Sequence, residues 1–237
     1  MSLDHTAADD LDQPAPRPET TPPPQLEALR TQLEARQFDA GLAGRPCRLV
    51  RAGAPARSLR VRRWRARAGR SDRWLLDGCQ GPTVDLGCGP GRLVSALIER
   101  GVPALGVDSS ALAVQLCARR GAVALHRDVF DPLPGEGRWH HALLADGNLG
   151  IGGDPVALLR RVRRLLGPRG SVFVELAADP GLWRGPARVL EPDGTASNWF
   201  PWAVVGADAI GAVAEAAGLR LGRLHRRRRH FAELHRV

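Results

Sequence analysis

The sequence predicts an α/β fold in which a mostly parallel β-sheet is covered by helices on both faces. From residue 71 onward, short and almost continuously apolar runs alternate with segments whose apolar residues recur at helical spacing. A glycine-rich turn over residues 87–91 joins the first of these runs to a helical segment, and acidic residues stand at or near the ends of the runs. These observations are typical of an open sheet that binds a ligand at the carboxyl ends of its strands.

The strands of this region are short apolar runs bounded by turn residues or by charged residues. We expect five of them, one ending at residue 86 and the others at 103–107, 122–126, 141–145 and 171–176. Helices are expected between and before them, at 71–79, 93–98, 111–120 and 155–166. Ser109 or Ser110 can cap the third helix, and Asp154 can cap the fourth, which has Pro155 at its first position.

The chain divides into a tail, an extension and a main domain. Residues 1–25 are rich in proline and poor in large apolar groups, which predicts a disordered tail. Residues 26–70 form an N-terminal extension and residues 71–237 the main domain, with a hairpin insert at about 184–203. Smaller features within these parts are a helix over 25–38, two short strands within 47–64, a hairpin signal at 193–194, a helix over 207–218, and two strands within 219–236 joined by an arginine-rich turn.

Composition limits the function classes. All 34 basic residues are arginine, and the formal net charge is +9, but an arginine-biased composition makes this weak evidence for a nucleic-acid partner. The four cysteines form no C-x-x-C pair, so no metal site and no redox pair is expected. Without a signal peptide or a long apolar run, the chain is expected to be cytoplasmic, with no membrane contact.

The glycine turn has the pattern D-x-G-x-G-x-G. Asp85 precedes Gly87, Gly89 and Gly91. A dinucleotide fingerprint would need a glycine where Arg92 stands, and a phosphate-binding P-loop would need a lysine, which the sequence lacks. The turn is therefore built for another ligand.

At this point the sequence resembles a known family, the class I S-adenosylmethionine-dependent methyltransferases. "VDLGCGPGRL" is similar to their first motif, "ALGVDSS" to the second, "RDVFDPLP" to the third, and "LLGPRGSVFVEL" to the segment that forms strand five. The stretch "LLADGNLGIGGDP" is most similar to uncharacterised members of actinobacterial type. Over residues 71–237 the resemblance implies a seven-stranded Rossmann-like sheet, mostly parallel, with an antiparallel C-terminal hairpin whose last strand lies beside strand five.

The acids fit the cofactor that the family uses. S-adenosylmethionine carries positive charge at its sulfur and its amino group, so carboxylates at one sheet edge suit it; these are Asp85, Asp108, Asp128, Asp146 and Glu175. The resemblance implies that Asp85 serves the amino group, that Asp108 accepts the ribose hydroxyls, and that Asp128 and the backbone of Val129 lie at the adenine. The full expected cofactor-binding set is Asp85, Gly87, Cys88, Gly89, Gly91, Asp108, Ser109, Asp128, Val129 and Asp146.

The acceptor side is less defined, and no catalytic residue can be assigned. Asp146 and Asn148 follow the fourth strand, where acceptors arrive in the family, so both are candidates. The stretch lacks the Asn/Asp-Pro-Pro-aromatic motif of enzymes that methylate the amino groups of DNA bases and protein glutamine. Trp199 and Trp202 either form an apolar wall for an acceptor or pack in the core.

The remaining candidates, which are histidines, one cysteine and two arginine clusters, can also have purely structural roles. His140 and His141 stand at the start of the fourth strand, at the amino edge and away from the site; His126 ends the third strand, and Cys88 is expected to pack rather than react. Arginines cluster over residues 57–70 around Trp64 and over 226–229, where they either bind RNA or form solvated turns.

The sequence therefore predicts a methyltransferase that acts on a small molecule. The alternatives are an RNA methyltransferase and a methyltransferase-like protein that binds the cofactor without turnover. The acceptor, the use of a general base and the oligomeric state are left open.

Overall fold

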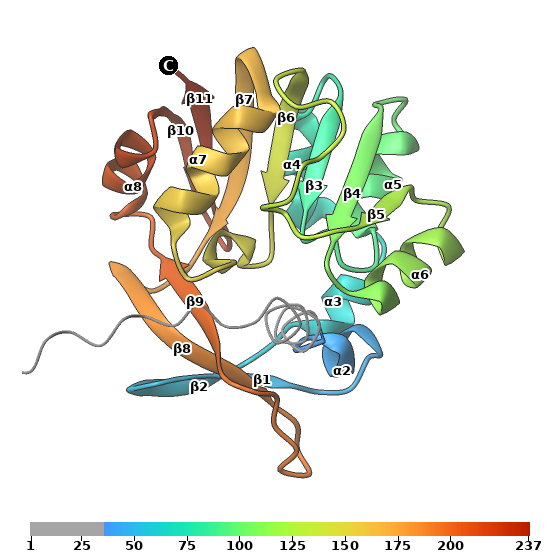
Figure 1. Cartoon of the computed structure of the whole chain (residues 1–237), viewed down its shortest axis with the longest axis vertical. Coiled ribbons are helices and arrows are strands. Elements are labelled where there is room, and N and C mark those ends of the chain that lie inside the picture. The colour runs from blue at the N-terminus through green and yellow to red at the C-terminus, as the bar shows by residue number, and fades with distance from the viewer. Residues whose placement is uncertain (1–35) are drawn as a thin grey trace, which may run out of the picture.

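The computed structural model describes residues 36–237, and most of its strands belong to one twisted sheet (Figure 1). This main sheet has seven strands in the order β10-β11-β7-β6-β3-β4-β5. Their bounds are β3 Thr83–Leu86, β4 Ala104–Asp108, β5 Ala124–His126, β6 Trp139–Leu144, β7 Leu166–Leu176, β10 Leu219–Arg226 and β11 His230–Arg236. Strands β3 to β7 run parallel, whereas β11 is antiparallel to both β7 and β10. The predicted fold class, with the last strand beside the fifth, is confirmed.

Helices cover both faces of the main sheet because its strands alternate their side chains between two cores. Leu144 and Val174 pack with helices α7 and α8, whereas Leu143 and Phe173 pack with α4 and α5 on the other face. Helix α6 lies on the same side as α5, where Cys117 contacts Val94 in a small buried cluster. The bounds are α4 Arg73–Gly78, α5 Arg92–Ile98, α6 Ala111–Arg119, α7 Pro155–Leu165 and α8 Ile210–Ala216.

The helix starts follow the capping residues in the sequence. Of the two candidate caps for α6, Ser110 is the one used, because its hydroxyl accepts a hydrogen bond from the Ala113 N–H at 3.2 Å. Asp154 caps α7 by accepting from the N–H groups of Val156 and Ala157 at 3.0 and 3.1 Å.

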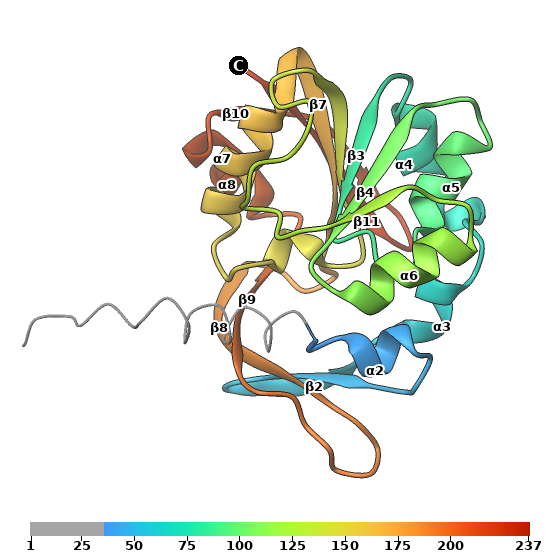
Figure 2. The same cartoon turned by 45° about the vertical axis from the view of Figure 1, so that its right-hand side comes forward.

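A second, four-stranded antiparallel sheet lies across the carboxyl edge of the main sheet (Figures 1 and 2). Its order is β2-β1-β8-β9, so the N-terminal hairpin pairs with the later insert through β1 and β8. We call this layer the roof sheet. Its strands are β1 Arg48–Arg51, β2 Ala54–Ser58, β8 Leu182–Leu190 and β9 Phe200–Val205. Two short helices flank the β1-β2 hairpin in the chain, α2 Asp39–Leu42 before it and α3 Val61–Arg65 after it.

One part of the extension differs from the sequence prediction. The two strands expected within residues 47–64 are found, but the second ends at Ser58, and Val61 begins helix α3. The reason is the spacing of Val61 and Trp64, which places both on one helical side, where they pack into the roof cluster with Phe38. The tail 1–25 and most of the helix expected at 25–38 lie outside the described residues.

Among the described residues, no helix combines the length and the apolar character that crossing a bilayer requires.

Candidate functional site

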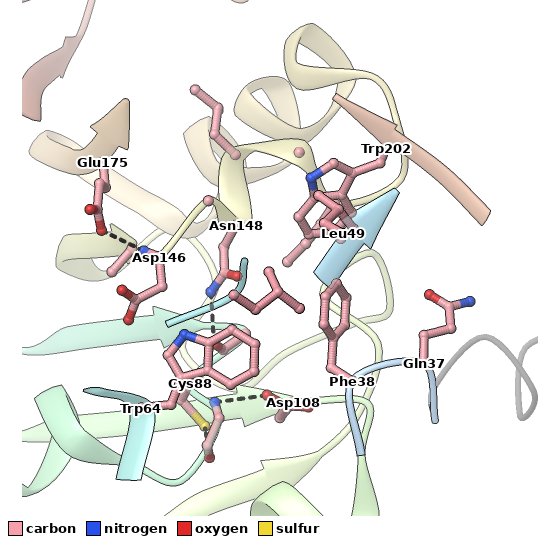
Figure 3. Close-up of a pocket in the computed structure, with 18 of the residues that line it drawn as sticks. Gln37, Phe38, Leu49, Trp64, Cys88, Asp108, Asp146, Asn148, Glu175 and Trp202 are labelled. Carbon is pink, nitrogen blue, oxygen red and sulfur yellow. Dashed lines mark hydrogen bonds between the residues drawn. The ribbon is translucent and has the colours of Figure 1, made fainter. Parts of the chain in front are cut away.

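A cavity of about 560 Å³ lies between the carboxyl edge of the main sheet and the roof sheet (Figure 3). One wall consists of the glycine turn and the loops after β4, β5 and β6. The opposite wall comes from the roof sheet and its flanking helices. It is mostly apolar, with Phe38, Leu49, Trp64 and Trp202 (labelled in Figure 3), and it also includes Arg51 and Arg57. The cavity therefore joins parts of the chain that the sequence analysis treated separately.

The glycine turn is shaped by left-handed backbone at Gly87 and Gly91, whose φ angles are +71° and +75°. The Gly87 N–H donates to the Val107 carbonyl oxygen at 2.8 Å, and Gly91 is the N-cap of α5. A Cβ at Gly87 would lie 2.6 Å from Nδ2 of Asn148, so the close packing of this side chain also requires glycine there.

Asn148 ties the loop after β6 to the glycine turn. Its Nδ2 donates to the carbonyl oxygens of Leu86 and Gly87 at 2.9 and 2.7 Å. The amide nitrogen of this acceptor-side candidate is thus engaged with the backbone of the cofactor-side turn.

Asp108 ends β4 and faces the cavity. Its Oδ2 accepts from the Gly89 N–H at 2.8 Å and its Oδ1 from the Ser110 N–H at 2.9 Å. A carboxylate has about four lone-pair sites, so it can accept further hydrogen bonds from a ligand. Burial raises the pKa of Asp108, while these two backbone N–H groups oppose the rise.

Asp128 and Val129 line the cavity beyond β5. Asp128 Oδ1 accepts from the Phe130 N–H at 2.9 Å, which closes a turn around the acid. The Val129 carbonyl accepts from Nε of Arg161 at 3.0 Å, and that contact fixes the backbone. Ser109 also lines the cavity, so the expected ribose and adenine residues lie together.

Asp85 is a buried acid at the base of the cavity. It is 3% exposed, and no ion pair to it is found within residues 36–237. Burial raises the pKa of Asp85 to about 7; Arg92 lowers it, and the charges of Asp146 and Asp108 add to the rise. A cationic ligand beside this carboxyl would favour its ionised form.

The remaining two strand-end acids take part in a buried ion network. Asp146 Oδ2 lies 2.6 Å from Nη2 of Arg92, and Asp146 Oδ1 lies 3.2 Å from Nη2 of Arg63. Glu175 contacts both Nε and Nη2 of Arg229 at 2.8 and 2.5 Å. The network pairs three arginines with three acids, the third being Asp72, which contacts Arg63, Arg92 and Arg229.

The same network surrounds Asp146, whose backbone has an unusual conformation. Asp146 has a φ of +55°, and it is the one non-glycine residue with positive φ in the described chain. Its N–H donates to Oε2 of Glu175 at 2.7 Å. Such a conformation costs about 1–3 kcal/mol unless its surroundings hold it, and here two arginines and Glu175 do so.

The two tryptophans of the insert have different surroundings. Trp202 is 9% exposed, lines the cavity, and lies 5.4 Å from the Phe38 ring centroid. Trp199 is 47% exposed, packs under Arg188 at 4.7 Å, and lines a separate outer groove. The structure thus brings Trp202, and not Trp199, to the cofactor-side residues.

The histidine candidates do not line the cavity, whereas Cys88 lines it but has a thiol that packs against a neighbouring cysteine. His141 is in the first half of β6, where Nδ1 lies 2.9 Å from Ser171 Oγ, and burial lowers its pKa. His126 is exposed, with Nε2 2.8 Å from the Ser109 carbonyl oxygen. The Cys88 thiol points to Cys117, 3.8 Å away, and this contact together with burial raises its pKa.

Several cavity residues were missed by the sequence analysis. Arg92 is mentioned in the sequence analysis only because it stands where a dinucleotide fingerprint would have a glycine. In the structure Arg92 directly follows the glycine turn and forms an ion pair with Asp146. Phe38, Leu49 and Arg51 also line the cavity. They belong to the N-terminal extension, to which the sequence analysis assigns no role. Trp64, the aromatic residue within the arginine cluster, was the one available signal for a cavity wall there.

Comparisons with known proteins agree with this geometry. Residues 83–170 match the model of a family described as methyltransferase domain. No curated protein matches. A methyltransferase from Bacteroides fragilis, solved with S-adenosyl-L-homocysteine, is 19% identical with a TM-score of 0.67, over 86% of this chain and 93% of that chain.

Two further solved structures are similar. The 1,6-didemethyltoxoflavin-N1-methyltransferase of Burkholderia thailandensis is 17% identical, with a TM-score of 0.56 over 96% of this chain and 93% of that chain. The amino pentose methyltransferase CalS10 of Micromonospora echinaspora is 14% identical, with a TM-score of 0.55 over 74% of this chain and 94% of that chain. At these identities the likeness shows the fold.

Proposed function

We propose that this chain, which has the fold of class I methyltransferases and matches a methyltransferase domain over residues 83–170, transfers a methyl group from S-adenosylmethionine to a small-molecule acceptor. The observation that carries the proposal is the single cavity in which an acid-lined glycine turn faces an apolar roof. One wall suits a cationic cofactor, and the other suits a compact organic acceptor.

The cofactor would be held by residues of the described cavity. Asp85 provides a carboxyl for the amino group, Asp108 has accepting capacity for the ribose hydroxyls, and Asp128 lies with Val129 where the adenine is expected. The positive φ at the glycine turn lets backbone approach the ligand closely. The similar proteins of Bacteroides fragilis and Burkholderia thailandensis were solved with the demethylated product, which supports this assignment.

The bound cofactor supplies an activated methyl group. The chain therefore has to align the acceptor and exclude water, and the roof sheet provides both functions over the glycine turn. No histidine lines the cavity within residues 36–237, so the proposal requires no histidine base. An acceptor that is already nucleophilic at neutral pH fits these surroundings.

A small acceptor is favoured over RNA because several arginines of the two clusters are paired with groups of the protein itself. Arg63 and Arg229 belong to the buried ion network, Arg67 pairs with Glu99, and Arg65 donates to the Ala43 carbonyl. The Burkholderia enzyme was solved with bound 1,6-didemethyltoxoflavin, and the Micromonospora enzyme is an amino pentose methyltransferase. Both compounds are small molecules, which supports the same choice.

Two measurements test the proposal. Calorimetry should show binding of S-adenosylmethionine and S-adenosylhomocysteine, and tighter binding of NAD would contradict it. A screen of metabolite extracts with methyl-labelled cofactor, read by mass spectrometry, should yield a labelled small molecule. Labelled RNA from a parallel incubation would favour the RNA alternative, and cofactor binding with no labelled product in either would favour a binding protein without turnover.

A further inference from the structure

The roof sheet presents a cationic group to the cavity. Arg51 in β1 and Arg57 in β2 both line it. Both guanidinium groups face one carboxylate, Asp179: Arg57 is ion-paired with it, and Arg51 Nη2 lies 3.8 Å from its Oδ2. Two cations facing one anion leave this group with a net positive charge. Arg60, exposed at the rim, adds charge of the same sign.

Arg51 is buried but incompletely satisfied. Its side chain is 8% exposed, and its Nε has no hydrogen-bond partner within residues 36–237. The guanidinium packs over the Trp183 ring at 5.2 Å. Burial and the charge of Arg57 lower the pKa of Arg51, and Asp179 opposes them. A buried cation with an unpaired donor is costly unless an anion completes its surroundings.

Arg51 belongs to the roof-side wall of the cavity, and the acids belong to the cofactor-side wall. The acids at the glycine turn suit a cation, whereas Arg51 and Arg57 would repel one. The apolar surfaces of Phe38, Leu49 and Trp202 belong to the same wall as Arg51. Leu49 and Arg51 are two residues apart in one strand, so they share the face that looks into the cavity.

We propose that Arg51, supported by Arg57, binds a carboxylate of the acceptor, whose flat apolar body lies against Phe38 and Trp202. The planar guanidinium fork matches a carboxylate, and a single negative charge balances the Arg51, Arg57 and Asp179 group. This inference rests on the proposed function, because it describes the acceptor of that reaction.

The test uses two pairs of probes that differ in charge but hardly in shape: 2-naphthoate with 2-naphthamide, and benzoate with benzamide. Calorimetry is done on the full chain saturated with S-adenosylhomocysteine. We expect at least one carboxylate to bind about tenfold more tightly than its amide, the size of one charge-assisted contact. Arg51→Met should abolish this preference, and Arg51→Lys should restore part of it.

The matched control is Arg48→Met. Arg48 lies in the same strand, but it is exposed on the opposite face, so this variant should keep the carboxylate preference. The S-adenosylhomocysteine affinity and the melting temperature are measured for every variant. If Arg51→Met does not fold, Arg57→Met provides the same test at a half-exposed position.

The outcomes separate the two proposals. Equal affinity of both members of each pair, no binding of any probe, or a preference that survives the Arg51→Met change overturns the carboxylate subsite. In all three cases, normal S-adenosylhomocysteine binding leaves the proposed methyl transfer standing. Failure of the unaltered protein to bind S-adenosylhomocysteine overturns the proposed function itself.

Discussion

The side-chain nitrogen of Asn148 lies 2.7 Å from the carbonyl oxygen of Gly87 and donates a hydrogen bond to it. This contact joins the loop after β6, on the acceptor side, to the first glycine of the cofactor turn. In the sequence analysis, Asn148 is named only as a candidate on the acceptor side. The structure adds that the same side chain is hydrogen-bonded to the turn, so a change at Asn148 acts on both sides of the cavity.

Replacing Asn148 should therefore weaken cofactor binding. Asn148→Ala removes two donated hydrogen bonds and leaves the Leu86 and Gly87 carbonyls without these partners. We expect a loss of about 1–2 kcal/mol in S-adenosylhomocysteine affinity, measured by calorimetry. Trp199→Ala, in the outer groove, is the control and should leave this affinity unchanged. Equal cofactor affinity in Asn148→Ala and the unaltered protein would show that the turn does not need the contact.

Asp108→Ala should cost more affinity than Asn148→Ala. A carboxylate that accepts both ribose hydroxyls makes two charge-assisted hydrogen bonds, so the expected loss is about 2–4 kcal/mol. The same change frees the Gly89 N–H from its 2.8 Å contact, which adds to the effect. Calorimetry with S-adenosylhomocysteine measures the loss, with circular dichroism as the check that the fold survives. A folded variant that binds normally would refute the ribose assignment.

Cofactor affinity should depend on pH through Asp85. The pKa of this carboxyl is raised by burial to about 7 in the free protein, so the group is mostly protonated at pH 6. The cationic amino group of the cofactor prefers the ionised form, and binding must then release a proton. Affinity for S-adenosylhomocysteine should rise by roughly tenfold from pH 6 to pH 7.5.

The matched variant for this pH effect is Asp85→Asn. It cannot ionise, so it should bind weakly and with little pH dependence over the same range. A pH slope in Asp85→Asn that equals that of the unaltered protein would assign the proton to another group.

Removing one member of the buried ion network should destabilise the fold. Arg92→Met leaves Asp72 and Asp146 with less compensating charge, and an unpaired buried charge costs about 3–5 kcal/mol. Arg67→Met is the control, because its pair with Glu99 is exposed and contributes about 0–1 kcal/mol. Urea unfolding measures both. Equal midpoints for the two variants would show that the network has no special role in stability.

Local patterns predicted the main sheet because its strands and helices are encoded by neighbouring residues. The apolar runs, Asp154 and the glycine turn each specify an element within a few residues. The roof sheet was missed because β1 pairs with β8, far along the chain, and no local signal encodes such a partner. The ion network was missed because the sequence contains 34 arginines, and no local pattern marks which of them are buried. Only the fold distinguishes Arg92 and Arg229 from solvent-exposed arginines.

The pairing of β1 with β8 also sets an order of events during synthesis. Leu49 is made early, but its partner Val189 follows only after β3 to β7 have been made. At typical translation speeds that interval is on the order of ten seconds. A lone two-stranded hairpin is marginal in water, so β1 and β2 spend the interval without a lasting partner. The cavity that would receive the acceptor is thus completed late in synthesis. Ribosome-bound chains that end before β8 cannot form the roof sheet.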